Sequence, residues 1–223
     1  MEGAKISNKH LNASCSLIRE EGFFSFILKT IRYINSNICG ISKTIIYEYD
    51  LENPTPKIAT NLDISLRLAS EKDIDSMDEE HYGYDQNGKK YSKNRFKNGD
   101  KCILALYNKK IVGYLWVMYD NMELSEYKLV PLSKNKVYSY KGFVMKKHRG
   151  KKIHWAMYHY LIDLVKKEGK RYILSGVKTD NEPAIRIKEK GVYKKIGNVI
   201  HFRFFGLKHD FIKKDVLRYI QNE

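Results

Sequence analysis

KVYSYKGFVMKKHRGKKIHWAMYHYLIDLVKKEGKRYILSGV, residues 136–177, is the stretch that decides the fold of this chain. Its first ten residues predict a strand that ends in the apolar residues 143–145. From Ile153 apolar residues recur at helical spacing as far as Gly169, and residues 171–177 form a second apolar run. A strand, an amphipathic helix and a second strand in this order predict a parallel β-α-β crossover.

The rest of the chain predicts further strands and helices around that crossover. Residues 101–120 predict two strands of a meander joined by a tight turn. Ser70 and Asn181 each head a short helical stretch. We therefore expect a mixed α/β fold, with a mostly antiparallel central sheet, one parallel crossover and flanking helices. The other expected elements are strands at 44–51, about 192–197 and 199–207, and a final amphipathic segment at 208–221.

An N-terminal extension precedes the main domain in the division that the sequence suggests. Residues 17–35 place large apolar side chains on one helical face. We expect this helix to pack on the core, with contact to a membrane surface as the alternative. Two prolines in residues 52–57 keep the following linker extended. The prediction is a helix–strand extension at 1–61 and a main domain at 62–223.

Composition excludes several classes of protein. With 43% hydrophobic and 13% aromatic residues, the 223-residue chain is apolar enough to bury a core and is not intrinsically disordered. It has no apolar run of transmembrane length, and its first residues lack the order of a secretory signal. Three widely spaced cysteines argue against a disulfide framework and a structural zinc site. We expect a cytoplasmic protein without a metal.

Positive charge is concentrated in the C-terminal part of the chain. Residues 136–223 contain 22 basic and 8 acidic residues, whereas the first 135 residues contain 19 and 18. Five Lys or Arg side chains fall between Lys146 and Lys152, between the predicted strand and helix. A helix start binds phosphate groups through its unpaired N–H groups. The alternatives are a bare basic surface and contact with a nucleic-acid backbone.

The same turn resembles motif A of the GNAT superfamily of acyl-CoA N-acyltransferases, Q/R-x-x-G-x-G/A after a strand. Three other stretches are similar to family motifs in the same order: ISLRLASEKDIDSM (64–77), KIVGYLWV (110–117) and NEPAIRIKEKGVYKKIG (181–197). The resemblance covers about residues 62–207. It implies that acetyl-CoA or another acyl-CoA is the co-substrate and that an amine is the acceptor.

The resemblance also implies a cofactor site along motif A. Backbone groups of Phe143, Val144 and Met145 would pair with the pantetheine arm, and an N–H near Val144 would hold the developing oxyanion. Asn181 would contact the cofactor or order the nearby loop. The acceptor amine would attack the thioester directly in a ternary complex. The residues expected to hold the pyrophosphate are Arg149, Gly150, Lys151, Lys152, Ile153 and His154.

Departures from the family pattern affect both motifs. Lys152 and His154 stand where motif A has small residues that let the backbone approach the pyrophosphate. In motif B, the tyrosine that often protonates the departing thiolate falls at Lys188, for which we expect the ordinary role of a solvated helix lysine. Tyr193, five residues further on, is the reserve acid.

No general base follows from the sequence with the same directness. Tyr138 and Tyr140 share a face of the predicted strand, and Glu123 and Glu126 lie in the loop before it. We predict Tyr193 and Tyr140 as the catalytic residues. The acceptor would bind near the polar residues 78–100 and the loop 120–136, where this family builds such sites.

Two other classes of function stay open. One is an acyl-CoA-binding regulatory module without activity, suggested by the altered motifs. The other is a basic protein that associates with nucleic acid or ribosomes, suggested by the charge of residues 136–223.

Overall fold

The structure, a computed structural model, describes residues 39–54, 60–77, 81, 88–125, 128–190 and 192–222. The chain divides into two compact units, residues 1–42 with 200–211 and residues 43–199 with 212–223. The second of these holds the crossover and the motifs that resemble the GNAT superfamily.

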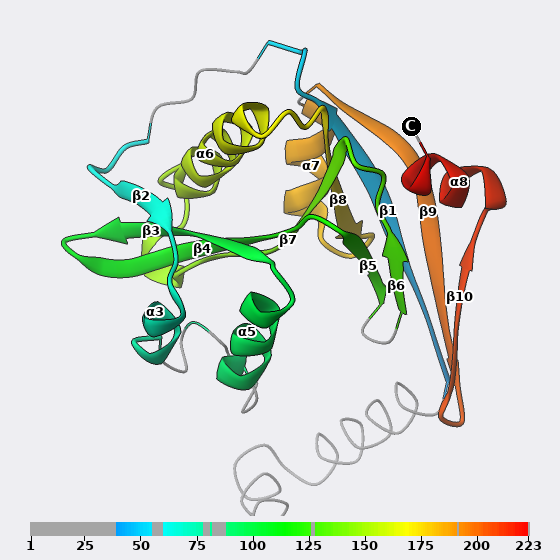
Figure 1. Ribbon diagram of the computed structural model, residues 1–223. Coiled ribbons are helices and arrows are strands. Elements are labelled where there is room, and N and C mark those ends of the chain that lie inside the picture. Colours follow the sequence, from blue (N-terminus) through cyan, green and yellow to red (C-terminus); the bar gives the residue numbers. More distant parts are fainter. Residues whose placement is uncertain are drawn as a thin grey trace, which may run out of the picture. The chain divides into compact units, whose positions relative to one another are not determined.

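The strands form one large sheet and one hairpin (Figure 1). The large sheet has the strand order β10-β9-β1-β8-β7-β4-β3-β2, and β5 pairs with β6. The strands are β1 (Cys39–Asp50), β2 (Ser65–Leu68), β3 (Lys101–Tyr107), β4 (Lys110–Met118), β5 (Asn121–Ser125), β6 (Lys128–Pro131), β7 (Lys136–Val144), β8 (Tyr172–Lys178), β9 (Tyr193–Phe204) and β10 (Leu207–Ile212). The helices are α3 (Glu71–Asp75), α5 (Gly88–Lys97), α6 (Ile153–Lys167), α7 (Glu182–Lys190), α8 (Lys214–Gln221) and the 3₁₀ turn η1 (Lys146–His148).

The predicted crossover is confirmed. β7 pairs with β8 in parallel, and α6 connects the two strands. The β1–β8, β2–β3, β3–β4 and β4–β7 pairs are antiparallel, which confirms the mixed, mostly antiparallel sheet. β1, which precedes the expected boundary at residue 62, pairs with β8 over residues 44–50. The division of the chain at that boundary stays a prediction.

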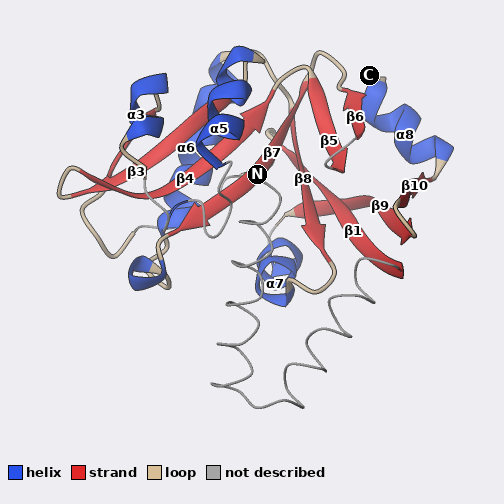
Figure 2. Cartoon of the chain, turned by 90° about the horizontal axis from the view of Figure 1, so that it is seen from below, coloured by secondary structure: helices blue, strands red, loops and turns tan. Residues whose placement is uncertain are grey.

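Different helices cover the two faces of the sheet (Figures 1 and 2). On one face, α6 buries Leu161 in a core cluster with Val137 of β7. On the other face, Ile74 of α3 and Ile220 of α8 share a cluster with Trp116 of β4. Successive residues of β7 contribute to opposite clusters, as the alternation of a strand requires. Residues on β7 can therefore reach either side of the sheet.

The end of the chain differs from the expected strands. Instead of strands at about 192–197 and 199–207, one long strand runs from 193 to 204 and the next begins at 207. The turn between them consists of Phe205 and Gly206, with φ angles of 44° and 82°, the left-handed conformations that a two-residue hairpin turn favours. Gly197 does not end β9. A Cβ there would lie 2.6 Å from the Val216 side chain, so the glycine permits close packing of α8.

Two further expectations concern the ends of the chain, and a third concerns helices that could span a membrane. The amphipathic segment at 208–221 is part strand, because β10 extends to Ile212 and α8 begins only at Lys214. In the smaller unit, His201 Nδ1 lies 2.7 Å from Asp210 Oδ1. The helix expected at 17–35 lies outside the described residues. Within the part of the chain that the structure describes, no helix is long and apolar enough to cross a membrane.

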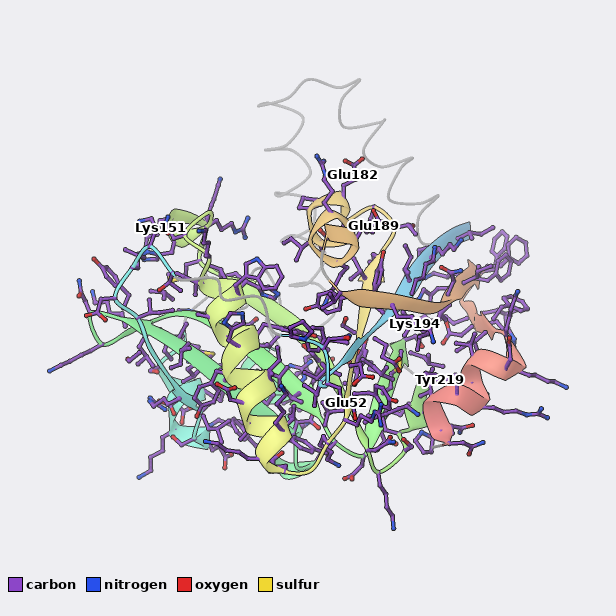
Figure 3. All side chains as sticks on the ribbon, turned by 90° about the horizontal axis from the view of Figure 1, so that it is seen from above. Glu52, Lys151, Glu182, Glu189, Lys194 and Tyr219 are labelled. Atoms are coloured by element: carbon purple, nitrogen blue, oxygen red, sulfur yellow. The ribbon has the colours of Figure 1, made fainter. Side chains whose placement is uncertain are left out.

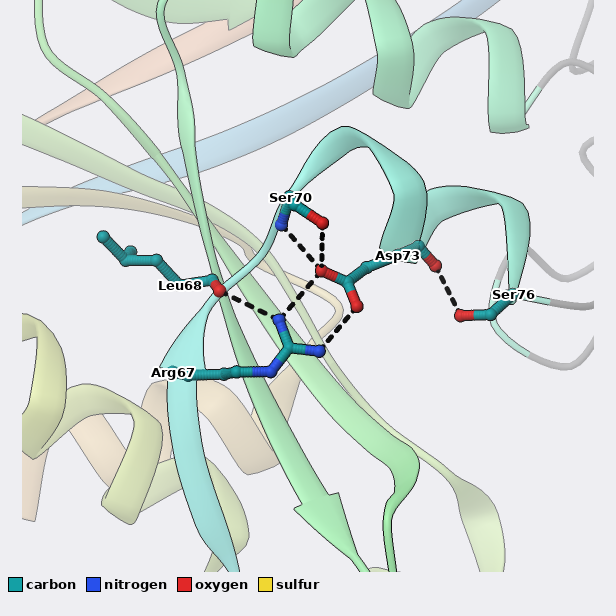
Figure 4. Close-up of polar contacts among 5 residues, drawn as sticks. All are labelled: Arg67, Leu68, Ser70, Asp73 and Ser76. Atoms are coloured by element: carbon teal, nitrogen blue, oxygen red, sulfur yellow. Dashed lines mark hydrogen bonds and ion pairs between the residues drawn. The ribbon is translucent and has the colours of Figure 1, made fainter.

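A charged corner fixes the start of α3 (Figure 4). The Asp73 carboxylate accepts hydrogen bonds from the Ser70 N–H at 2.7 Å and the Ser70 hydroxyl at 2.8 Å. The Arg67 guanidinium donates two more, at 2.6 and 2.8 Å. The hydrogen bonds from Arg67 hold the pKa of Asp73 well below its ordinary value of 3.8. The predicted cap at Ser70 is thus part of a larger network that ties α3 to β2.

We expect Asp73→Asn to lower the melting temperature by about 2–4 °C at neutral pH. Loss of a cap and a partly exposed ion pair is worth about 1 kcal/mol, which shifts a domain of this size by about that amount. Because folding lowers this pKa, the stabilisation is complete above pH 3.8 and is lost as the pH falls below that value. Thermal unfolding of both proteins at pH 7 and in acid measures it; a deficit that grows in acid would contradict the assignment.

Candidate functional site

The two parallel strands part where their ladder ends. Their last pair is Ser139 of β7 and Ser175 of β8. Beyond it β8 continues to pair with β1, from Gly176 opposite Ile46 onward, and β7 continues to pair with β4. The inner edges of β7 and β8 therefore stop bonding to each other while both strands run on. Backbone groups on the inner edge of β7 face this opening.

A bulge in β7 lies at the opening. Trp116 pairs with Tyr140 and Tyr114 with Phe143, so Lys141 and Gly142 together oppose a single residue of β4. Lys141 has a left-handed φ of 46°. Bulges of this kind bend a strand and redirect its groups, and they are common beside active sites.

The bulge leaves the N–H of Val144 directed into the opening. The Met145 N–H donates to the Val112 carbonyl at 2.9 Å, so the backbone of Met145 faces β4. The adjacent residue of a strand points the opposite way, toward β8. Arg149 Nε donates to the Val144 carbonyl at 3.1 Å, which occupies that acceptor from the same side. The Val144 N–H is thus the donor that the strand offers beside the opening.

The turn from β7 to α6 combines backbone donors with positive charge. Gly150 and Lys152 have left-handed φ angles of 77° and 61°. A Cβ at Gly150 would meet no atom within 4 Å. The first intrahelical bond of α6 runs from the Ala156 N–H to the Lys152 carbonyl, so the N–H groups before it lie outside the helix ladder. Figure 3 shows Lys151 at this end of α6.

Nine of the ten predicted cofactor residues lie in this one region, along 143–154. Met145 and Ile153 are buried. The half-buried residues are Phe143, Val144, Lys151 and His154, and the exposed ones are Arg149, Gly150 and Lys152. The tenth, Asn181, precedes α7, and its side-chain oxygen accepts the Ala184 N–H at 3.3 Å. Asn181 therefore caps α7, as the sequence predicts.

The two predicted catalytic tyrosines are not brought together. Tyr140 belongs to the core cluster on the α3 side of the sheet, whereas Tyr193 packs against the cluster on the α6 side. The Tyr140 hydroxyl donates to Asp100 Oδ2 at 2.6 Å. Burial, and then the bond to Asp100, raises the pKa of Tyr140, and burial raises the pKa of Asp100. Tyr140 therefore keeps its proton at neutral pH. Glu126, another candidate base, lies outside the described residues.

On the α6 side, Tyr193 belongs to an aromatic cluster. Its ring centroid lies 5.3 Å from that of Tyr49 and 5.8 Å from that of Tyr158. The Lys188 Nζ lies over the same rings, 3.9 Å from the Tyr193 centroid and 4.7 Å from the Tyr158 centroid.

The expectation that Lys188 is a solvated helix lysine is wrong. The residue is only 7% exposed, and burial lowers the pKa of its ammonium group to about 7. The signal was present in the sequence, because Lys188 follows Ala184 and Ile185 by four and three residues. Those spacings share a helix face, and both residues pack on the core.

Buried hydroxyl groups surround the same region. Tyr47 stands opposite Ser175 in the β1–β8 pair. The hydroxyl oxygens of Tyr47 and Ser175 are buried, and neither forms a hydrogen bond of ordinary length and angle with another residue that the structure describes. Buried polar atoms normally have partners, so these oxygens indicate a place for a polar ligand or water.

Comparison with protein families agrees with this geometry. Residues 66–192, more than half of the chain, match the model of the acetyltransferase (GNAT) family. The chain belongs to the GNAT acetyltransferase family. Membership confirms the resemblance seen in the four motifs and supports acyl transfer as the general chemistry. No curated protein matched the sequence.

Solved structures with the same fold are distant in sequence. A GCN5-related N-acetyltransferase from Sphaerobacter thermophilus is 15% identical with a TM-score of 0.55, covering 78% of this chain and 55% of that one. A Drosophila protein is 8% identical with a TM-score of 0.54 over 83% and 58%. A conserved Staphylococcus epidermidis protein is 11% identical with a TM-score of 0.53 over 78% and 65%. The chain thus spans less than two thirds of each, and these likenesses show the GNAT fold alone.

The candidate site is built from backbone groups and a few kinds of side chain. Within the described ranges, no group of three or more His, Cys, Asp or Glu side chains is placed to hold a metal ion. The groups at the opening are backbone N–H donors, cations, tyrosines and serines.

We expect Tyr140→Phe to lower the free energy of unfolding by about 1–3 kcal/mol. The Asp100 carboxylate is 8% exposed, and it would lose a buried hydrogen-bond donor. Tyr91→Phe, on the half-exposed surface of α5, is the matched control and should change the free energy by less than about 0.5 kcal/mol. Urea unfolding measures both, and equal effects would contradict the role of the Asp100 bond.

Lys188→Met should raise the melting temperature, and by more at pH 6 than at pH 9. Folding lowers this pKa from 10.5 to about 7, so the penalty for burying the amine grows as the pH falls from 10.5 to 7 and is largest below 7. Methionine fills similar space without a charge. Arg186→Met, an exposed position on α7, is the control. A gain that is absent at pH 6 would contradict a charged amine in this environment.

Proposed function

We propose that this GNAT protein is an acyl-CoA-dependent N-acyltransferase that moves an acetyl or other acyl group to an amine. The observation that carries the proposal is the opening between β7 and β8, with the basic, amide-rich start of α6 at its end. An extended amide-containing chain with a pyrophosphate at one end fits this combination.

Different residues of motif A would contact different parts of the acyl-CoA. The exposed edge of β7 at Val144 would bond to a pantetheine amide or hold the thioester oxygen, since its N–H faces the opening. The N–H groups of residues 150–154 and the cations Arg149, Lys151 and Lys152 would hold the pyrophosphate, since the Arg149 N–H already donates to the Lys146 carbonyl. The Met145 N–H has no part in this, because it is already bonded to Val112.

The residues beside the opening would position the thioester for attack by the amine. An amine attacks the thioester carbonyl in a ternary complex, and a donor at the oxyanion typically contributes a large share of the rate. The amine must be neutral to attack, so its proton must leave to a base or to solvent. Tyr193 and Tyr140 stay predicted catalytic residues. For Tyr140, a role in proton transfer would run through Asp100.

We expect coenzyme A or acetyl-CoA to raise the melting temperature by about 5–10 °C at a concentration 100 times its dissociation constant. Ligand binding to the folded state then contributes about 2.7 kcal/mol. Arg149→Glu should remove this shift, because it reverses a charge at the pyrophosphate. Lys167→Glu makes the same charge change at the opposite end of α6 and should keep the shift.

Two results of that experiment would count against the proposal. A wild-type melting curve that millimolar coenzyme A leaves unmoved would exclude the cofactor. Salt-dependent RNA binding that acetyl-CoA does not displace would favour the nucleic-acid alternative. Thermal stabilisation without release of free thiol across a panel of amines would instead favour the regulatory module.

A further inference from the structure

Lys188 is a buried cation that no carboxylate in the described part of the chain neutralises. Burial is the cause of its lowered pKa. The titratable groups that face it are His154 and Tyr158 from α6 and Tyr193 from β9, with Tyr49 of β1 behind the two tyrosine rings. No ion pair forms between Lys188 and an acidic side chain of the described ranges. Its neighbour Glu189 acts on Tyr47, whose pKa it raises after burial.

A purely structural lysine is a poor explanation for this environment. Burying an amine without a counter-charge destabilises the folded state, and an apolar side chain of similar length would fill the same space. The contacts with tyrosine rings offset part of that cost while the amine is charged. A lysine at this position is therefore better explained by a chemical role that an apolar side chain could not perform.

The position of the amine supplies that role. His154 lies over the bulge of β7, where a Cβ on Gly142 would come within 3.0 Å of its ring. The His154 ring lies 6.3 Å from the Tyr158 ring, and the Lys188 Nζ lies 4.7 Å from the centroid of that same Tyr158 ring. Burial, and then the positive charge of Lys188, lowers the pKa of His154 to about 4. On the same side of the sheet, the buried Ser175 hydroxyl has no hydrogen-bond partner among the described residues. The amine thus belongs to the group of side chains that includes His154, the ring that lies over the bulge beside the opening.

We propose that the Lys188 ammonium group donates the proton to the thiolate that leaves when the acyl group is transferred. This inference rests on the proposed function. The acceptor nitrogen bonds to the thioester carbonyl carbon, and the C–S bond breaks with its electron pair on sulfur. Lys188 gives one proton to the sulfur, which forms the free thiol. The acceptor nitrogen releases its surplus proton to solvent, and Lys188 takes one back.

The pKa values of the two groups favour transfer of the proton from the Lys188 ammonium group to the thiolate sulfur. A free thiol has a pKa of about 8.5, whereas the Lys188 ammonium has a pKa of about 7. The proton therefore moves downhill to sulfur, which a lysine with an ordinary pKa near 10.4 would not achieve. The neutral imidazole of His154 adds no charge that would oppose it.

Steady-state kinetics of Lys188→Met test the inference through thiol release. We expect kcat to fall about 100-fold or more, with the KM for acetyl-CoA changed little. Wild-type kcat should fall as the pH rises through the range above about 7, because the donor loses its proton, and the variant should lack this alkaline limb. Arg186→Met removes an exposed cation of the same helix and should keep both kcat and the limb. A Lys188→Met enzyme with wild-type kcat would overturn the inference.

A direct titration separates this inference from the proposed function. Competitive labelling of the whole protein with trace acetic anhydride at several pH values, read by mass spectrometry, gives the pKa of the Lys188 amine. We expect a value near 7, raised when coenzyme A brings its sulfur close to the ammonium group. If coenzyme A binds and thiol is released while this pKa stays unchanged, the inference alone fails. If neither binding nor thiol release occurs, the proposed function fails with it.

Mass spectrometry of the protein after turnover adds one further outcome. A donor of protons keeps its amine free, so Lys188 should remain unmodified after incubation with acetyl-CoA. Stoichiometric acetylation of Lys188 would make it an acceptor of the acyl group and would overturn its assignment as the acid.

Discussion

The end of the β7–β8 ladder at Ser139 and Ser175 is the constraint on which the rest of the site depends. Beyond that point β8 stays paired with β1 and β7 stays paired with β4, so both strands remain in the sheet although they separate from each other. Only the inner edges are opened, and the bulge at Lys141 bends β7 away. Backbone groups inside a protein need partners, and in the proposed function the open edge at Val144 would meet that need by bonding to the acyl-CoA.

The site then uses two kinds of cation in two environments. The side chains of Arg149 and Lys152 are exposed, which would suit a pyrophosphate that itself remains partly in water. Lys188 is buried among tyrosine rings, where burial makes its charge conditional on pH. The first kind can bind an anion throughout the reaction, whereas the second can give up a proton during it.

The sequence predicted those parts of the site that depend on local pattern. Alternation and helical spacing over 136–177 were enough to find the crossover, and the cations between Lys146 and Lys152 marked the turn. The β5–β6 hairpin was missed although residues 121–125 alternate between polar and apolar side chains, because its two strands are only five and four residues long. The separation of Tyr140 from Tyr193 could not be predicted, since it depends on how β7 and β9 share a sheet. Lys188 was misassigned by residue type, although its helix spacing already placed it on the apolar face.

The structure accommodates the two larger residues that replace the small residues of motif A. Lys152 adopts a left-handed conformation that a glycine would adopt more easily, at a cost of about 1 kcal/mol, and its side chain is exposed. The backbone path is thereby preserved and a cation is added. His154 is accommodated from the other side, because the strand residue beneath it is Gly142, which has no Cβ to meet the ring. The space that a small helix residue would leave in motif A is thus provided here by a strand residue, Gly142. The imidazole that takes its place is in the first turn of α6, beside the basic turn, and its ring lies 6.3 Å from the Tyr158 ring that Lys188 contacts. The start of α6 therefore connects the group that would bind the pyrophosphate with the group that would protonate the sulfur.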